Sequence, residues 1–209
     1  QAKGATLFMT LLTGFQSLLY RYTGQEDIRV GVPIANRHRT ETQGVVGFFV
    51  NTQVLRNPLD GRLSLAKALE QGKRAALGAQ EHQDLPFEQL VEALQPDRSL
   101  SQTPLFQVMF NHQWQDYGEL PTLPGLEPSS WPLDKGESQF ELTLNVVERA
   151  DNFLKASFVY AKELFDSITI ERLAQHYTAM LLALVETPEC ALGDIELLDK
   201  GEQRQLQEW

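Results

Sequence analysis

The sequence is poor in cysteine and in long apolar runs, and each scarcity narrows the classes of protein it can belong to. Cys190 is the one cysteine among 209 residues, so it can form no intramolecular disulfide, and we predict a structural role for it. A single thiol fits a reducing compartment, so we predict a cytoplasmic protein. Because no apolar run reaches 18 residues and no signal peptide is recognisable, we expect no membrane partner.

The signatures of several common enzyme classes are also missing. The sequence contains no dinucleotide fingerprint, no phosphate-binding P-loop and no nucleophile elbow. Its histidines lie far apart and lack the spacing of metal ligands, so we predict neither a metal site nor a catalytic residue from these patterns. The net charge of −10 and the pI of about 4.9 argue against binding to nucleic acid.

Hydrophobic periodicity predicts alternating helices and strands in one domain. We expect helices over residues 5–22, 64–80, 84–94 and 168–186. We expect strands over residues 28–32, 45–55, 104–113, 140–146 and 154–160, the last two joined as a hairpin. Ser64 and Asp84 are the predicted N-caps, and the strand at 45–55 is expected to be buried on both faces. This order predicts an α/β protein, a two-layer sandwich with a mixed β-sheet.

Two segments break the periodic pattern. Residues 36–44 are polar and carry Arg37 and Arg39 in an otherwise acidic chain, which predicts a solvated loop or a contact with an acidic partner or a phosphate. Residues 114–138 contain four prolines, at 121, 124, 128 and 132. Irregular segments of this length inside a compact domain are usually functional, or they grip something outside the domain.

Polar residues at the ends of apolar strands are the candidates for binding. Asn51 and Thr52 follow an apolar run, so their side chains must bond either a neighbouring loop or a ligand. Gly47, in the same run, allows close approach of a second backbone or a substrate. Both interpretations of Asn51 are left open by the sequence.

A second polar group surrounds His112. Asn111 and Gln113 flank this histidine at the end of a predicted strand, where it could act as a general base. Since no carboxylate partner is evident in the sequence, we interpret His112 as a residue that lines a polar pocket or is satisfied internally.

Three strings in order carry a family resemblance. They are Val-Val-Gly-Phe-Phe-Val-Asn-Thr within residues 45–56, His-Gln-Asp-Leu-Pro-Phe-Glu at 82–88 and Arg-Ser-Leu-Ser-Gln-Thr-Pro-Leu at 98–105. Together they resemble the later core motifs of condensation domains from nonribosomal peptide synthetases. The catalytic motif of that family, two adjacent histidines followed three residues later by Asp-Gly, is absent. The chain therefore resembles the C-terminal half of such a domain.

The resemblance implies one half of a V-shaped pair of chloramphenicol-acetyltransferase-like subdomains. It assigns residues 1–191 to this half and 192–209 to the start of a linker toward an adenylation domain. It makes the loop at 36–46 the floor of a substrate tunnel and part of 114–138 its latch. The residues that it places along the tunnel are Gly47, Asn51, Thr52, Asn111 and Gln113. Because the chain starts within a helical pattern, we expect it to be cut from a longer polypeptide.

The implied reaction is amide formation between groups carried as phosphopantetheine thioesters on carrier proteins. The resemblance implies no cofactor bound by this chain itself, no activity without the N-terminal half, and an exposed apolar face where that half docks. Alternatives are half of an epimerisation or dual epimerisation/condensation domain, or a carrier-docking module that uses Arg37 and Arg39. A further alternative is a self-sufficient trimeric acyltransferase with His112 as base.

Overall fold

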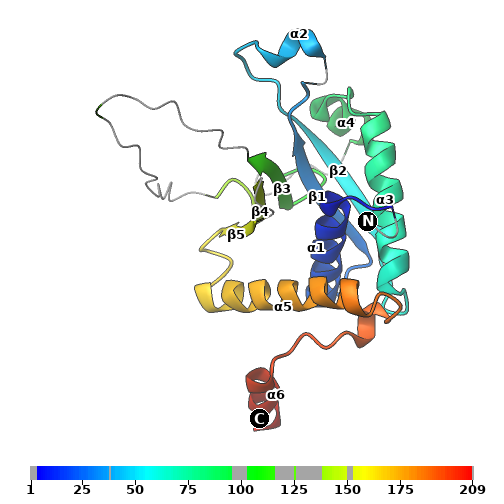
Figure 1. Ribbon diagram of the computed structural model, residues 1–209, viewed down its shortest axis with the longest axis vertical. Coiled ribbons are helices and arrows are strands. Elements are labelled where there is room, and N and C mark those ends of the chain that lie inside the picture. Colours follow the sequence, from blue (N-terminus) through cyan, green and yellow to red (C-terminus); the bar gives the residue numbers. More distant parts are fainter. Residues whose placement is uncertain are drawn as a thin grey trace.

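A mixed five-stranded sheet forms the centre of the computed structural model, which describes residues 4–37, 39–95, 103–115, 125, 138–149 and 153–208. The strands are β1 (Asp27–Ile34), β2 (Asn51–Pro58), β3 (Val108–Gln115), β4 (Leu142–Arg149) and β5 (Leu154–Tyr160). Their order across the sheet is β2-β1-β3-β4-β5 (Figure 1). Pairs β1–β2 and β4–β5 are antiparallel, whereas β3 runs parallel to both β1 and β4. The predicted α/β class, mixed sheet and hairpin strands are confirmed.

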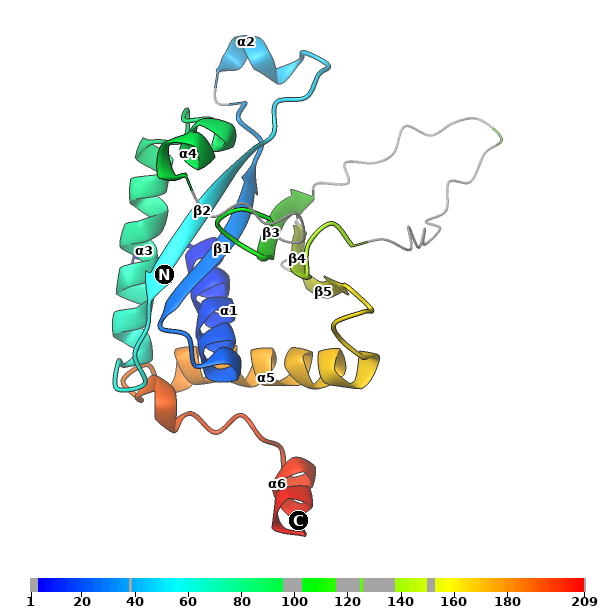
Figure 2. The same ribbon diagram turned by 180° about the vertical axis from the view of Figure 1, so that it is seen from behind.

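Three long helices pack on one face of this sheet, which we call the covered face (Figures 1 and 2). They are α1 (Leu7–Thr23), α3 (Leu65–Glu81) and α5 (Ser167–Glu186). Helix α1 begins where the Thr6 side chain accepts a hydrogen bond from the amide of Met9. It ends at Gly24, whose φ of 68° suits a left-handed C-cap. Among the described helices, none is both long and apolar enough to cross a bilayer.

The core lies between these helices and the sheet. Among its side chains that have no exposed surface are Phe15, Val30, Phe110 and Leu144. Each lies on the side of its helix or strand that faces inward, as the periods of 3.6 and 2 residues require. Buried polar side chains also lie in this layer, among them Thr13, Ser17 and a bonded pair of amides: Asn57 Nδ2 donates to Gln16 Oε1 at 3.1 Å. Gln16 in turn donates to the carbonyl of Leu55 at 3.0 Å, so the buried amides largely satisfy each other.

The expected strand at residues 45–55 is shorter than predicted. Strand β2 starts at Asn51, and residues 45–50 belong to a protruding loop that also contains the short helix α2 (Thr40–Gln43). Val46 is fully exposed and Phe48 is 91% exposed, so the prediction of a strand buried on both faces is wrong there. An apolar run predicts hydrophobic contact, and here nothing among the described residues covers these side chains.

The second correction concerns α4 (Phe87–Leu94). Pro86 occupies its N-cap, and Asp84 lies in the preceding turn, so the predicted Asp84 cap is wrong. The Ser64 cap of α3 is confirmed, since its hydroxyl accepts from the amide of Lys67. Pro86 supplies no side-chain cap, and the first amide of α4 is bonded instead by a residue of β2 that is described below.

After α5 the chain returns along the bottom of the helical layer. The short 3-10 helix η1 (Leu192–Asp194) is followed by helix α6 (Lys200–Gln207). Leu192 and Ile195 are buried in the main core, and Arg21 donates to the carbonyls of both residues at 2.8 Å. The proposed boundary at residue 191 therefore falls beside residues that pack with the first part of the chain. Most of the predicted latch at 114–138, the string at 98–102, His38 and the turn at 150–152 lie outside the described residues.

Candidate functional site

The face of the sheet opposite the three helices presents a row of polar side chains, and we call it the open face. Asn111 of β3 pairs in register with Asn145 of β4, which pairs with Ser157 of β5. On the other side of β3 lies β1, whose Gly31 pairs in parallel with Met109, so that Pro33 lies level with Asn111. Thr52 of β2 pairs with Pro33 and therefore lies level with Asn111 as well. We call Thr52, Asn111, Asn145 and Ser157 the polar row. All four side chains point away from the core, because their strand neighbours point into it.

The centre of the polar row is a pair of amides. Asn111 Nδ2 donates to Asn145 Oδ1 at 3.1 Å, and both residues are half-buried. This bond leaves the Asn111 oxygen and the Asn145 NH₂ group with hydrogen-bonding capacity toward the open face. Gln113 lies one step further along the same face of β3 and is exposed. The structure thus brings together three of the predicted residues: Thr52, Asn111 and Gln113.

Asn51 lies on the other face and has a structural environment. Its Nδ2 donates to the carbonyls of Gln83 at 3.3 Å and Leu85 at 2.9 Å. Its Oδ1 accepts from the amide of Phe87 at 3.1 Å, which is the first residue of α4. Asn51 therefore caps α4 from a distant strand, and its amide bonds a neighbouring loop, which is one of the two interpretations that the sequence left open.

The first two family-like strings meet at this corner of the molecule, next to Phe106, which follows the third string. Asn51 of the first string bonds Phe87 of the second, and the Phe87 ring lies 5.7 Å from the ring of Phe106, just after the third. Phe106 also packs on Phe140 at 5.4 Å and covers Gly31 of β1, where a Cβ atom would collide with its ring. In this structure, these contacts join β2, α4 and the segment that leads into β3.

The protruding loop is organised by Arg37. Its guanidinium donates to the carbonyls of Thr42 at 2.6 Å, Val45 at 2.7 Å and Gly47 at 3.1 Å, and it stacks 4.1 Å from the centre of the Phe49 ring. Gly47 therefore lies in this loop, away from the polar row, with its carbonyl bound to Arg37. The Arg37 charge is used within the loop, whereas the Arg39 residue at the N-cap of α2 is exposed.

His112 has a carboxylate partner that the sequence did not reveal. Its Nε2 lies 3.3 Å from Glu148 Oε2 on the paired strand β4, so the expectation of no partner is wrong. Burial lowers the pKa of His112, although Glu148 acts in the opposite direction. The ring packs between Phe8 and Phe110, which places it on the covered face. His112 is consequently separated by the sheet from the polar row.

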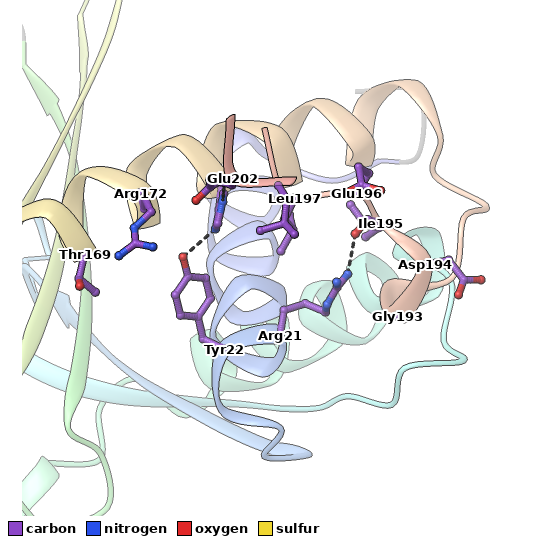
Figure 3. Close-up of a pocket in the computed structure, with 12 residues that line it drawn as sticks. Arg21, Tyr22, Thr169, Arg172, Gly193, Asp194, Ile195, Glu196, Leu197 and Glu202 are labelled. Carbon is purple, nitrogen blue, oxygen red and sulfur yellow. Dashed lines mark hydrogen bonds and ion pairs between the residues drawn. The ribbon is translucent and has the colours of Figure 1, made fainter. Parts of the chain in front are cut away.

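The sequence analysis did not anticipate a pocket on the helical side of the molecule. Its volume is about 630 Å³, and it lies between α1, α5 and the segment 193–202 (Figure 3). Three of its lining residues, Tyr22, His176 and Glu202, form a hydrogen-bonded line. These three residues are too far apart in the sequence for a spacing pattern to predict their contact. The Asp199-Xaa-Xaa-Glu202 pattern could have predicted the start of α6, because it is typical of a capping box.

Comparisons with known proteins agree with the motif resemblance. The sequence model of the family described as "Condensation domain" matches residues 1–207. The chain is 42% identical over 208 residues to malpinin synthetase of Mortierella alpina, covering 100% of this chain and 3% of that protein. It is 42% identical over 199 residues to tyrocidine synthase 3 of Brevibacillus parabrevis, covering 95% of this chain and 3% of that protein.

Solved structures give the same answer at the level of fold. A four-domain nonribosomal peptide synthetase bound to AMP and glycine superimposes with a TM-score of 0.83 and 25% identity, covering 95% of this chain and 16% of that one. The first condensation domain of the calcium-dependent antibiotic synthetase gives 0.70 and 18% identity, covering 95% of this chain and 43% of that one. The chain spans only a few per cent of the curated relatives' length. It belongs to the condensation domain family of nonribosomal peptide synthetases.

Proposed function

We propose that this chain is the C-terminal lobe of a peptide-bond-forming condensation domain and that it works with a second lobe that carries the paired histidines. One observation carries this proposal. The chain aligns almost completely with a solved condensation domain but covers only 43% of it, and no two of its own histidines are adjacent. A fold match to less than half of a domain supports a lobe whose catalytic base lies elsewhere.

In the proposed reaction the amine of the acceptor attacks the thioester carbonyl of the donor. A C–N bond forms, the C–S bond breaks, and the proton lost by the amine passes through the histidine of the other lobe to the departing thiolate, which leaves as the free thiol. Donor and acceptor are aminoacyl or peptidyl groups, each held on a carrier protein by a phosphopantetheine arm. We assign no proton transfer to the residues of this chain.

The polar row supplies the hydrogen-bonding groups of this lobe. Phosphopantetheine arms and peptides both carry secondary amides, which need one donor and one acceptor each when they leave water. Asn111 and Asn145 offer these groups side by side, and Thr52 and Gln113 flank them on the same face. Their proposed role is to line the tunnel and orient the arms, which raises the fraction of productive encounters.

The protruding loop supports a docking role toward the other lobe. Val46 and Phe48 are almost fully exposed, and Val45 and Val50 are about half-exposed. Clustered apolar side chains on a surface often mark a protein interface. We therefore assign the loop as the tunnel floor, which the second lobe covers, whereas the Arg37 bonds within the loop argue against the carrier-docking alternative.

The remaining partners follow from the same family context. Carrier proteins deliver both substrates, and an adenylation domain follows the linker that we place at residues 192–209. The cytoplasm is the proposed compartment, where the thiols of the carriers stay reduced.

Reconstitution tests the proposal directly. The chain is incubated with donor- and acceptor-loaded carrier proteins, alone or with the lobe that carries the paired histidines, and products are read by mass spectrometry. We expect peptide only in the combined sample, and none when the second of the paired histidines is replaced by alanine. Peptide formed by this chain alone would overturn the division of labour. Inversion of the donor stereocentre without peptide, read by chiral chromatography, would favour the epimerisation alternative.

A further inference from the structure

Three helices meet through one line of polar side chains beside the 630 Å³ pocket. The Tyr22 hydroxyl of α1 lies 2.7 Å from His176 Nδ1 of α5, and His176 Nε2 lies 2.9 Å from Glu202 Oε2 of α6. His176 and Glu202 are largely buried, with 8% and 14% of their side-chain surfaces exposed. Figure 3 shows Tyr22 directed toward the region of Glu202, with Arg172 to one side. We call Tyr22, His176 and Glu202 the polar lock.

The direction of each hydrogen bond follows from the groups themselves. Glu202 is an acceptor when ionised, and its pKa is lowered chiefly by the hydrogen bond with His176. His176 Nε2 must therefore carry the proton in that bond. Burial raises the pKa of Tyr22, the charge of Glu202 raises it further, and Arg172 opposes both. Tyr22 therefore stays protonated, and next to a neutral imidazole it donates to Nδ1, so that one tautomer satisfies both neighbours.

The same carboxylate also closes the first turn of α6. Glu202 Oε2 accepts from the backbone amide of Asp199 at 3.0 Å, while Asp199 Oδ1 accepts from the amides of Gly201 and Glu202 at 2.7 and 2.8 Å. This reciprocal arrangement is a capping box. The start of α6 and its attachment to α5 therefore depend on one side chain.

Helix α6 has little apolar surface with which to dock. Leu206 is the single large apolar residue in its sequence, and it is 62% exposed. Gln203 bonds Glu196 at 3.1 Å and the carbonyl of Leu198 at 3.3 Å, but both belong to the segment that leads into α6. Among the described residues, the His176–Glu202 bond is the hydrogen bond that joins an α6 side chain to the helical layer.

We propose that the polar lock docks α6 on the helical layer and thereby fixes the direction in which the chain continues beyond this lobe. The occupant of this docking surface is the α6 segment itself, recognised through its capping-box carboxylate. The charged groups that act on the lock are Arg172 of α5, which opposes the raised pKa of Tyr22, and Asp199, which opposes the lowered pKa of Glu202. Arg21, Asp194 and Glu196 line the adjoining pocket. Because release exposes almost no apolar surface, it costs little hydrophobic free energy, and the attachment is reversible.

Nitrogen-15 relaxation of this chain alone tests the lock. In the unaltered chain we expect backbone order parameters of about 0.85 over residues 201–206, equal to those of α5. His176→Ala and Glu202→Ala should lower them below about 0.6 while the values of the sheet stay unchanged. Glu208→Ala removes an exposed carboxylate at the end of the same helix and should change nothing.

Two further variants make the outcome decisive. Asp199→Ala removes the capping side chain but keeps the lock, so it should fray the first turn without freeing the helix as a unit. Tyr22→Phe should move the side-chain nitrogen shifts of His176 by removing the donor to Nδ1. Order parameters that stay high in both lock variants, or that are already low in the unaltered chain, would overturn the proposal. Neither result bears on condensation activity, so this test and the reconstitution fail independently.

Discussion

The two faces of the sheet carry opposite kinds of side chain, although they share the same backbone. On the covered face Phe110 and Leu144 are fully buried, whereas on the open face their neighbours Asn111 and Asn145 stay half-exposed and bond each other. Stability is concentrated on the first face because burial of apolar surface drives folding. The second face is free to hold groups that recognise substrate. The comparison shows that the face toward which a side chain points distinguishes a residue of the core from its neighbour in the same strand, which is a candidate for binding.

The sharpest test of the covered face is Phe110→Ala. This ring is fully buried and contacts Phe8 and Phe15, so its loss removes buried area and leaves a cavity. We expect the free energy of unfolding in urea to fall by about 3–5 kcal/mol. Ser157→Ala on the open face is the matched control, with an expected change within about 0.5 kcal/mol. Similar losses for both variants would remove the distinction between the faces.

Gly31→Ala tests a part of the open face that is packed. A Cβ atom at this position meets the Phe106 ring, so the ring or the strand must shift. We expect a loss of about 1–3 kcal/mol in the free energy of unfolding. The double variant Gly31→Ala/Phe106→Leu should recover part of that loss, measured as a double-mutant cycle. A neutral Gly31→Ala variant would show that Phe106 does not cover β1.

The stability of the covered face should also depend on pH, because a buried tyrosine ionises only when the protein unfolds. Burial raises the pKa of Tyr177, which packs between α5 and the core and donates to the carbonyl of Leu11 at 3.0 Å. Its contribution is complete below about pH 10, where both states are protonated, and is lost as pH rises and only the unfolded state ionises. Stability should fall by about 1.4 kcal/mol per pH unit from this group above about pH 10. Tyr177→Phe should flatten that slope, as read from urea midpoints between about pH 9 and 11.5.

Asn111→Ala should change stability least and function most. Asn111 is half-buried and bonds one side chain among the described residues, so we expect the free energy of unfolding to change by less than about 1 kcal/mol. In the reconstituted reaction, loss of one amide contact should lower the rate about 5–10-fold. Asn145→Ala should give a similar effect, and the double variant should add little because the two residues act as one unit. An unchanged rate in all three would remove the polar row from the site.

Several features could be predicted because local signals decide them. The helices of the covered face follow from periodicity and from the cap at Ser64, and the β4–β5 hairpin follows from alternation. Asn111, Gln113 and Thr52 could be named as candidates because polar residues beside apolar strands stand out in the sequence, and their role in a site stays a prediction. Their common face could not be derived without strand order.

The missed features depend on contacts between distant segments. The Asn51 amide replaced the local cap expected from Asp84, and Glu148 reached His112 only because β3 and β4 lie in parallel register. The apolar run at 45–50 was interpreted as buried because its partner surface is not specified by the run itself. The polar lock joins Tyr22 and Glu202 across most of the chain, beyond the reach of any spacing rule.

The place of β3 in the sheet has a consequence for how the lobe forms. Strands β1–β2 and β4–β5 each join neighbours along the chain, whereas β3 pairs in parallel on both sides and closes the sheet between them. Parallel pairing of distant segments carries the largest loop-closure entropy, so it is expected late in folding. We therefore expect insertion of β3 to limit the rate of folding. A nascent chain from which residues 108–115 have not yet emerged holds an unfinished sheet with exposed edges, which is when it most needs protection from aggregation.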